Sequence, residues 1–328
     1  MKYLTYLILV VACIFSAAIP MATAAEPAVN KSMVPADGTK VWELWLPPNG
    51  TPVRAVLVCP RWGDGAKMVK LAQEHLGAKL GIGTMLSWRD ADILDQFKDP
   101  AFVASISDCL ARSAVKLNRS ELANVPLLIW AHSNAAWYLQ NTLKIMPERV
   151  AVYCLFKSAF GKNNDLGTMS KDAIAAFGLS IWDENDRIGK GYDNQREKKL
   201  MLDNLSAARK QGALVHVTMV RGTHHLIDGQ EKLMLAFFES AIAMRIPPSA
   251  NPAKEPVKLI SGLEKIGWIQ EESSKTVYLW DRYPAGKDPR RGWWLPTREY
   301  AELWNGYARN AKGTVIAHNA AYTRPSGR

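Results

Sequence analysis

The sequence has little cysteine, and its cysteines are far apart. Only four of the 328 residues are cysteine, and three of these, Cys59, Cys109 and Cys154, lie beyond the N-terminal segment. An odd number at wide spacing argues against a disulfide framework, and no Cys-x-x-Cys pair or Cys/His zinc spacing occurs. Cys59 and Cys154 fall in apolar runs, where a thiol packs as a small hydrophobic group. We therefore expect no cysteine nucleophile, no metal and no cofactor.

Long apolar stretches are absent after the N-terminus, so the sequence predicts no transmembrane segment. The N-terminus has the parts of a secretory signal: an early positive charge, an apolar region over Leu4–Ile19 and the small-residue cleavage site Ala22–Ala24. We predict a signal peptide over residues 1–25 and a secreted or periplasmic protein. The run Val10–Cys13 also fits a lipoprotein signal, so anchoring through a lipid on Cys13 is the alternative.

The formal net charge is +10, but no long block of lysine and arginine accounts for it. Acidic residues are interspersed with basic ones along the whole chain. This pattern is typical of a basic, soluble surface and argues against a basic tail for nucleic acid. We expect no nucleic-acid partner, and attraction to acidic polymers or anionic surfaces is the alternative. The sequence does not indicate an oligomeric state.

Apolar runs and amphipathic stretches alternate along most of the chain, a pattern typical of a doubly wound, mostly parallel α/β sheet. Continuous apolar runs predict strands buried on both faces, and a 3.6-residue repeat predicts the crossover helices. The predicted strands are Val41–Pro47 (at an edge), Arg54–Pro60, Gly81–Trp88, Val125–Trp130, Arg149–Phe156, Ile174–Trp182 and Leu214–Val220. The predicted helices are Ala66–Leu80, Ala101–Leu117, Asn134–Met146, Gln195–Gln211 and Gln230–Ala243.

The composition divides the chain into a lead, a main domain and an appendage. Residues 26–40 are small and polar and predict a flexible lead, and residues 41–247 form the main α/β domain. Residues 248–328 start with a proline-rich linker and are rich in tryptophan and tyrosine. This segment predicts a small α+β appendage with a helix over Pro296–Arg309. We expect its aromatic side chains to build a core of the appendage's own. The alternative is a stacking platform for sugars or a lid over a site.

The most informative motif follows the predicted strand Val125–Trp130. A helical pattern starts at Asn134, so Ser133 lies at the apex of a strand–turn–helix. Such a turn forces the serine into a strained backbone conformation and presents its hydroxyl at the end of the sheet. Small residues, here Ala131 and Ala135, are needed on either side because strand and helix pass close together. The pattern predicts Ser133 as a nucleophile.

A serine nucleophile needs an imidazole as its base and a carboxylate that fixes the tautomer of the imidazole. Both follow in the chain order that this kind of sheet uses, each in the loop after a predicted strand. The first loop carries Asp183 and Asp186, and the second carries His224 and His225. A serine, an acid and a histidine in three loops in this order arise by chance far less often than any one of these loops alone.

These segments resemble those of the α/β-hydrolase superfamily. AHSNAA (residues 131–136) resembles the nucleophile elbow, WDENDRIG (182–189) the acid loop and RGTHHL (221–226) the histidine loop. The resemblance extends over about residues 41–245 and implies the α/β-hydrolase fold for that part of the chain.

The resemblance also implies roles for individual residues. Ser133 is the nucleophile, Asp186 the acid and His225 the base, with Asp183 and His224 as second choices. The sequence departs from the family pattern by placing alanines beside the serine, where glycines are usual. Asp183 likewise occupies a position where the acid loop often has glycine.

An oxyanion hole completes the implied site. One donor is the backbone amide of Asn134, and the other lies in the loop Cys59–Gly65, at Trp62 or Arg61. The rival interpretation of this loop is a simple glycine-containing turn. The resemblance implies a serine hydrolase that cleaves a small-molecule or carbohydrate-linked carboxylic ester. A peptidase of the same fold and a non-catalytic binding protein on this scaffold are the alternatives.

Overall fold

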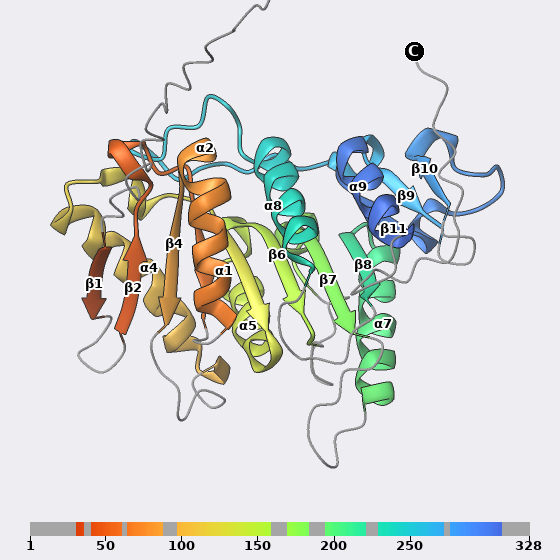
Figure 1. Cartoon of the computed structure of the whole chain (residues 1–328), viewed down its shortest axis with the longest axis horizontal. Coiled ribbons are helices and arrows are strands. Elements are labelled where there is room, and N and C mark those ends of the chain that lie inside the picture. The colour runs from red at the N-terminus through yellow and green to blue at the C-terminus, as the bar shows by residue number, and fades with distance from the viewer. Residues whose placement is uncertain are drawn as a thin grey trace, which may run out of the picture.

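A computed structural model of the chain describes residues 31–35, 41–60, 64–87, 97–158, 169–183, 194–220, 229–271 and 276–309. The centre of the molecule is an eight-stranded sheet with the order β1-β2-β4-β3-β5-β6-β7-β8 (Figure 1). The strands are β1 (Lys31–Pro35), β2 (Val41–Trp45), β3 (Ala55–Cys59), β4 (Ile82–Ser87), β5 (Leu127–His132), β6 (Val150–Phe156), β7 (Phe177–Asp183) and β8 (Leu214–Val220). β2 is antiparallel to both of its neighbours, and β3 to β8 are parallel to one another.

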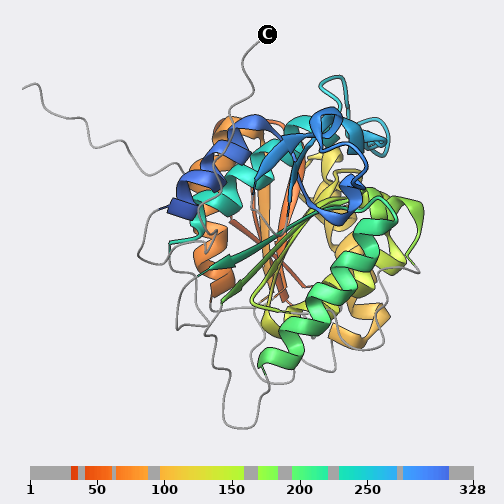
Figure 2. The same ribbon diagram turned by 90° about the vertical axis from the view of Figure 1, so that its right-hand side faces the viewer.

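Helices cover both faces of the sheet (Figure 2). One face carries α1 (Asp64–Ala72), which continues through Gln73–Gly77 into α2 (Ala78–Leu80), and α8 (Glu231–Arg245). The other face carries α4 (Pro100–Lys116), α5 (Ala136–Ile145), α6 (Lys171–Ala175) and α7 (Asn194–Lys210). The parallel strands are mostly apolar because both of their faces lie in a helix-covered core. The predicted doubly wound, mostly parallel sheet is confirmed.

Two predictions about the limits of elements are wrong. Lys31–Pro35 was predicted as part of a flexible lead, but it pairs with Val41–Trp45 as the edge strand β1, so the strand at Val41 is not the edge. Backbone pairing suffices for an edge strand, which needs no apolar alternation. The strand predicted from Ile174 begins instead at Phe177, because Ser170 accepts a hydrogen bond from the Ala173 amide and caps the short helix α6.

The described part of the Trp-rich appendage contains a three-stranded antiparallel sheet and the α-helix α9. Its elements are β9 (Trp268–Gln270), β10 (Val277–Leu279), β11 (Trp293–Leu295) and α9 (Arg298–Arg309), with the strand order β10-β9-β11. Trp268, Trp294, Tyr300 and Trp304 are all buried, and they lie in the same apolar core as α8 and the sheet. The appendage thus shares a core with the sheet instead of building its own. The domain boundary after residue 247 stays a prediction.

The appendage packs beside the amino ends of β7 and β8. Phe177, the first residue of β7, lies edge-on to Trp294 with ring centroids 4.5 Å apart. Figure 1 shows the three short strands beside the starts of these two strands. The described part of the appendage therefore lies away from the carboxyl ends of the strands, where ligands bind in such sheets.

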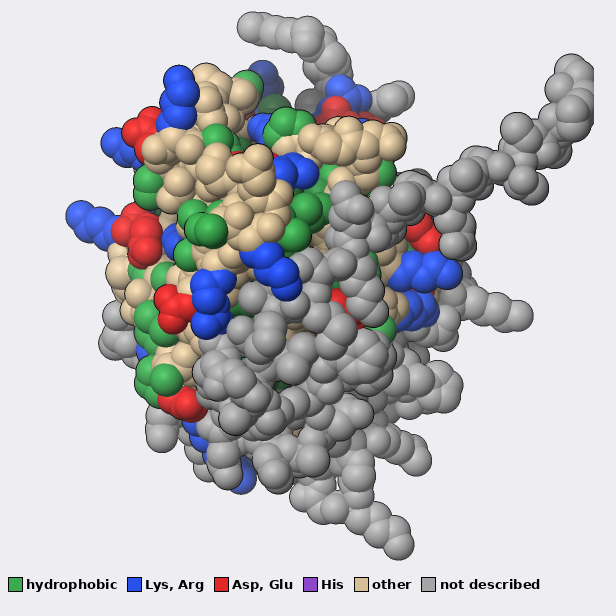
Figure 3. Space-filling model, turned by 90° about the vertical axis from the view of Figure 1, so that its left-hand side faces the viewer, with side chains coloured by type: hydrophobic (Ala, Val, Ile, Leu, Met, Phe, Trp, Pro, Cys, Tyr) green, Lys and Arg blue, Asp and Glu red, His purple; other side chains and the backbone are tan. Residues whose placement is uncertain are grey.

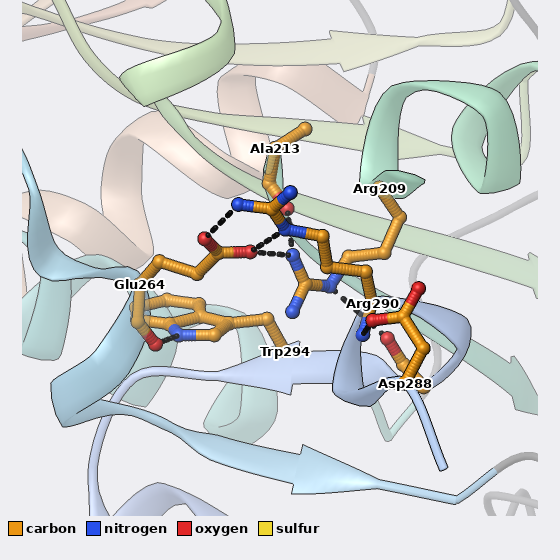
Figure 4. A network of polar contacts seen from close by, with 7 residues as sticks. Arg209, Ala213, Glu264, Asp288, Arg290 and Trp294 are labelled. Atoms are coloured by element: carbon orange, nitrogen blue, oxygen red, sulfur yellow. Dashed lines mark hydrogen bonds and ion pairs between the residues drawn. The ribbon is translucent and has the colours of Figure 1, made fainter. Parts of the chain in front are cut away.

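Two polar clusters hold the appendage in place. In the first, Glu264 bridges the guanidinium groups of Arg209 on α7 and Arg290, with N···O distances of 2.9 Å to each (Figure 4). Arg209 is 1% exposed and also donates to the Gly292 carbonyl at 3.0 Å. In the second, the His216 ring on β8 lies 2.9 Å from the Tyr300 hydroxyl.

The surface mixes charges of both signs. On the side that carries the β1–β2 edge, the described basic and acidic side chains are interspersed (Figure 3). Within the described ranges, no helix has the length and apolar character that a membrane span requires. The predicted signal peptide and Cys13 lie outside the described residues.

Candidate active site

Every residue predicted for the site stands at the carboxyl end of a parallel strand or follows it in the chain. β3 ends at Cys59, β5 at His132, β7 at Asp183 and β8 at Val220. These ends lie along one edge of the sheet, with β6 between β5 and β7. Neighbouring strands are about 5 Å apart, so the ends from β3 to β8 span roughly 20 Å. Loops of ordinary length from these ends can meet over a single cleft.

Ser133 has the strained backbone that the sequence predicted. It directly follows β5, begins a single 3-10 turn (Ser133–Ala135) and is followed at once by α5. Its φ is 54°, in the left-handed region, which costs a residue with a side chain about 1 kcal/mol or more. The side chain is half-buried. Strand, sharp turn and helix thus place Ser133 at the carboxyl edge of the sheet.

The alanines beside Ser133 fit the turn. Ala131 and Ala135 are both 0% exposed and lie in the core under α5. The turn therefore holds a methyl group on either side while Ser133 keeps its left-handed φ. Alanine in place of the usual glycine leaves the backbone of the elbow intact.

A second left-handed residue lies next to Ser133, and no sequence pattern indicated it. His132 of β5 pairs with Phe156 of β6, so Ser133 and Lys157 follow at the same level of the sheet. Lys157 has a φ of 48° and is 1% exposed. The next residue, Ser158, donates a hydrogen bond from its hydroxyl to the Ser133 carbonyl. A lysine and a serine after a fully buried strand form no recognisable motif, so only the structure reveals this corner.

The three buried cysteines of the described part of the chain offer no thiolate nucleophile. Burial raises the pKa of the Cys109 thiol to about 11 and raises those of Cys59 and Cys154 further, so all three stay protonated near neutral pH. His132 is 4% exposed and packs against the Phe156 ring, with centroids 5.4 Å apart. These residues belong to the packing of the sheet.

The other predicted site residues lie outside the described part of the chain. These are Trp62 with its alternative Arg61, the acid Asp186, and the two histidines His224 and His225. The backbone of Asp183 is described: it ends β7 and pairs with Val220 of β8. The structure therefore brings Ser133 and Asn134 to the same sheet edge as the starts of the acid and histidine loops. The convergence of a triad stays a prediction.

No known sequence family and no curated protein matches this chain. Several solved structures are similar to this chain in fold. The native structure of a novel cold-adapted esterase from an Arctic intertidal metagenomic library is 16% identical, with a TM-score of 0.46 over 64% of this chain and 92% of that one. The siderophore hydrolase EstB from Aspergillus nidulans is 12% identical, with a TM-score of 0.45 over 68% and 96%. An IroE-like serine hydrolase from Shewanella oneidensis is 11% identical, with a TM-score of 0.48 over 65% and 80%.

The fold follows from the topology of the chain itself. The sheet has one antiparallel strand, β2, inside an otherwise parallel series, and crossover helices lie on both faces. A serine with left-handed φ stands between β5 and α5, as in a nucleophile elbow. These features are those of the α/β-hydrolase fold.

Proposed function

We propose that this protein is a serine hydrolase that cleaves a carboxylic ester through an acyl-enzyme intermediate. The observation that carries the proposal is the left-handed φ of 54° at Ser133, at the end of β5 on the carboxyl edge. Backbone strain in a residue with a side chain persists where the surrounding structure holds it, and such residues cluster at functional sites. A glycine would relieve this strain, but a glycine has no hydroxyl.

The proposed chemistry has two steps. In the first, the Ser133 oxygen attacks the ester carbonyl carbon while His225 takes the hydroxyl proton and passes it to the leaving alcohol. In the second, water attacks the acyl-enzyme, and His225 transfers the water proton back to Ser133 as the acid is released. Asp186 orients His225, and the amides of Asn134 and Trp62 donate to the oxyanion. An ester is the expected substrate because an alkoxide leaves more easily than an amide nitrogen.

Turnover of p-nitrophenyl acetate by four proteins tests these roles. Ser133→Ala and His225→Ala are expected to lower kcat/KM by about 10⁴-fold or more, because the nucleophile and its base act as a unit. His224→Ala is expected to keep at least about a third of the activity, since it lies outside the proposed triad; a change of this size is under 1 kcal/mol in barrier. If His224→Ala were inactive and His225→Ala active, the base would be His224.

The two rival functions give different results. A peptidase would hydrolyse an acyl p-nitroanilide as well as the matching ester, whereas an esterase would hydrolyse only the ester. A non-catalytic binding protein would turn over neither substrate, and wild type would not differ from Ser133→Ala. The flanking alanines are the reason to consider a protein without catalytic activity. The intact left-handed backbone at Ser133 supports the enzyme instead.

Export is a separate part of the proposal. The N-terminal motif supports cleavage after Ala24 or Ala25 and release to the periplasm or the medium. The intact mass of the protein recovered from an exporting bacterial host tests it. A mature chain that begins at Ala25 or Glu26 is expected. A chain that retains residues 1–25, or one that carries a lipid on Cys13, would contradict it.

A further inference from the structure

The carbonyl oxygen of Ser133 is held from two sides. The Ala136 amide, at the start of α5, is shared between the Asn134 carbonyl and the Ser133 carbonyl of the same turn. The hydroxyl of Ser158, which follows β6, donates to it from the neighbouring strand. A carbonyl oxygen can accept two hydrogen bonds, and the Ser158 hydroxyl is the donor that comes from outside the turn. Ser158 is 8% exposed, and its hydroxyl therefore has little competition from water.

Fixing this oxygen also fixes the amide that follows it. The carbonyl of Ser133 and the N–H of Asn134 belong to one peptide unit, which is planar, and in its trans form they point in opposite directions. A hydrogen bond that holds the oxygen therefore determines where the N–H points. That N–H is the oxyanion donor in the proposed mechanism, and such donors stabilise a transition state only when they are already aligned.

The corner that carries Ser158 is itself strained. Lys157 has a φ of 48°, and its amide donates to the Ile181 carbonyl of β7 at 2.7 Å. The left-handed turn at Lys157 bends the chain off β6, so that the next residue reaches across to β5. A strained corner that delivers one hydroxyl to the backbone of the proposed nucleophile points to a function for that contact.

We propose that Ser158 is a positioning residue for the oxyanion hole. Its hydroxyl holds the peptide between Ser133 and Asn134 in the orientation that aims the Asn134 amide at the developing oxyanion. This inference rests on the proposed esterase function. A positioning role predicts that removing the hydroxyl lowers kcat by a larger factor than it weakens substrate binding. A merely structural role predicts no such selective loss in kcat.

The test compares wild type with Ser158→Ala and Ser158→Thr in the full chain. With p-nitrophenyl acetate, Ser158→Ala is expected to lower kcat about tenfold, equivalent to about 1.4 kcal/mol in the barrier, with KM within about twofold of wild type. The rate of reaction with a fluorophosphonate probe, whose tetrahedral adduct uses the same donors, is expected to fall in parallel. Ser158→Thr keeps the hydroxyl and is expected to restore most of both rates.

Ser105→Ala is the matched control, because Ser105 on α4 also donates its hydroxyl to a backbone carbonyl, that of Phe102 at 2.7 Å. This variant is expected to keep wild-type kinetics. A folded Ser158→Ala with unchanged kcat and labelling rate would overturn the inference while leaving the esterase proposal intact. If Ser158→Ala does not fold, Ser158→Cys replaces it, and equal rates for Cys and Thr would overturn the inference. An inactive, unlabelled wild type would instead overturn the esterase proposal, and this inference with it.

Discussion

The backbone of Ser133 carries strain that a glycine would not. At a φ of 54°, Ser133→Gly is expected to be more stable than Ser133→Ala by about 1 kcal/mol, because alanine keeps the side-chain clash of the left-handed region and glycine has none. Both variants are expected to be inactive. Urea denaturation of the two proteins measures the difference in the free energy of unfolding.

Ser105 in the helix α4 provides the control for this comparison. There the order of stability is expected to reverse, with Ser105→Ala above Ser105→Gly by about 1 kcal/mol, because glycine in a helix loses more backbone entropy. An alanine variant at position 133 as stable as the glycine variant would mean that the elbow is relaxed in solution.

The serine and its strained turn were predictable because the pattern is local. An apolar run, small neighbours and a helical repeat all fall within a dozen residues of Ser133. The contact from Ser158 was not predictable, since it joins two residues 25 positions apart in sequence, and their alignment depends on the pairing of His132 with Phe156. Local patterns hold no information about which side chain lies beside a neighbouring strand end.

At the scale of elements, Gly81 shows why α2 ends where it does. This residue has a φ of 69°, and a Cβ placed on it would lie 2.4 Å from the Pro52 carbonyl oxygen. Gly81→Ala is expected to lower the free energy of unfolding by more than about 2 kcal/mol, since the strain of the left-handed region adds to a steric overlap with backbone. Thermal or urea unfolding measures this loss.

Gly50 separates these two effects. It has the same φ of 69°, but no atom lies within 4 Å of the position of its Cβ. Gly50→Ala is therefore expected to cost about 1 kcal/mol, the conformational part alone. Equal losses at the two positions would show that the close approach of Pro52 does not matter.

Strands buried on both faces were the most predictable elements, because continuous apolar runs such as Arg149–Phe156 have no other common explanation. β1 was not predictable, since Lys31–Pro35 is held by backbone pairing to β2 and its side chains follow no pattern. The short strands β9 and β11 were missed for a related reason. Three residues are too few to establish a repeat.

At the scale of the whole molecule, Glu264 links the appendage to α7. Burial raises the pKa of this carboxyl, but the hydrogen bonds from Arg290 and Arg209 outweigh burial and hold the pKa below its usual value. A lowered pKa in the folded state means that the carboxylate stabilises the fold above the unfolded pKa near 4.3. This contribution is lost as the pH falls through the folded value.

Glu264→Gln is therefore expected to cost about 2 kcal/mol at pH 7, since Arg209 is buried and loses its charged partner. Urea denaturation at pH 7 and again at about pH 3 is expected to show the difference from wild type shrinking on acidification. Glu302→Gln is the control, because its pair with Arg298 is largely exposed, and we expect a change within about 0.5 kcal/mol. A difference for Glu264→Gln that is independent of pH would exclude the carboxylate as its cause.

Covalent labelling shows whether Ser133 is an activated nucleophile. The folded full chain is treated with a fluorophosphonate probe, digested and mapped by mass spectrometry. We expect a single adduct on Ser133 in wild type, no adduct in Ser133→Ala, and no adduct in protein unfolded in urea before the probe is added. An unlabelled wild type, or an adduct on a different serine, would contradict it.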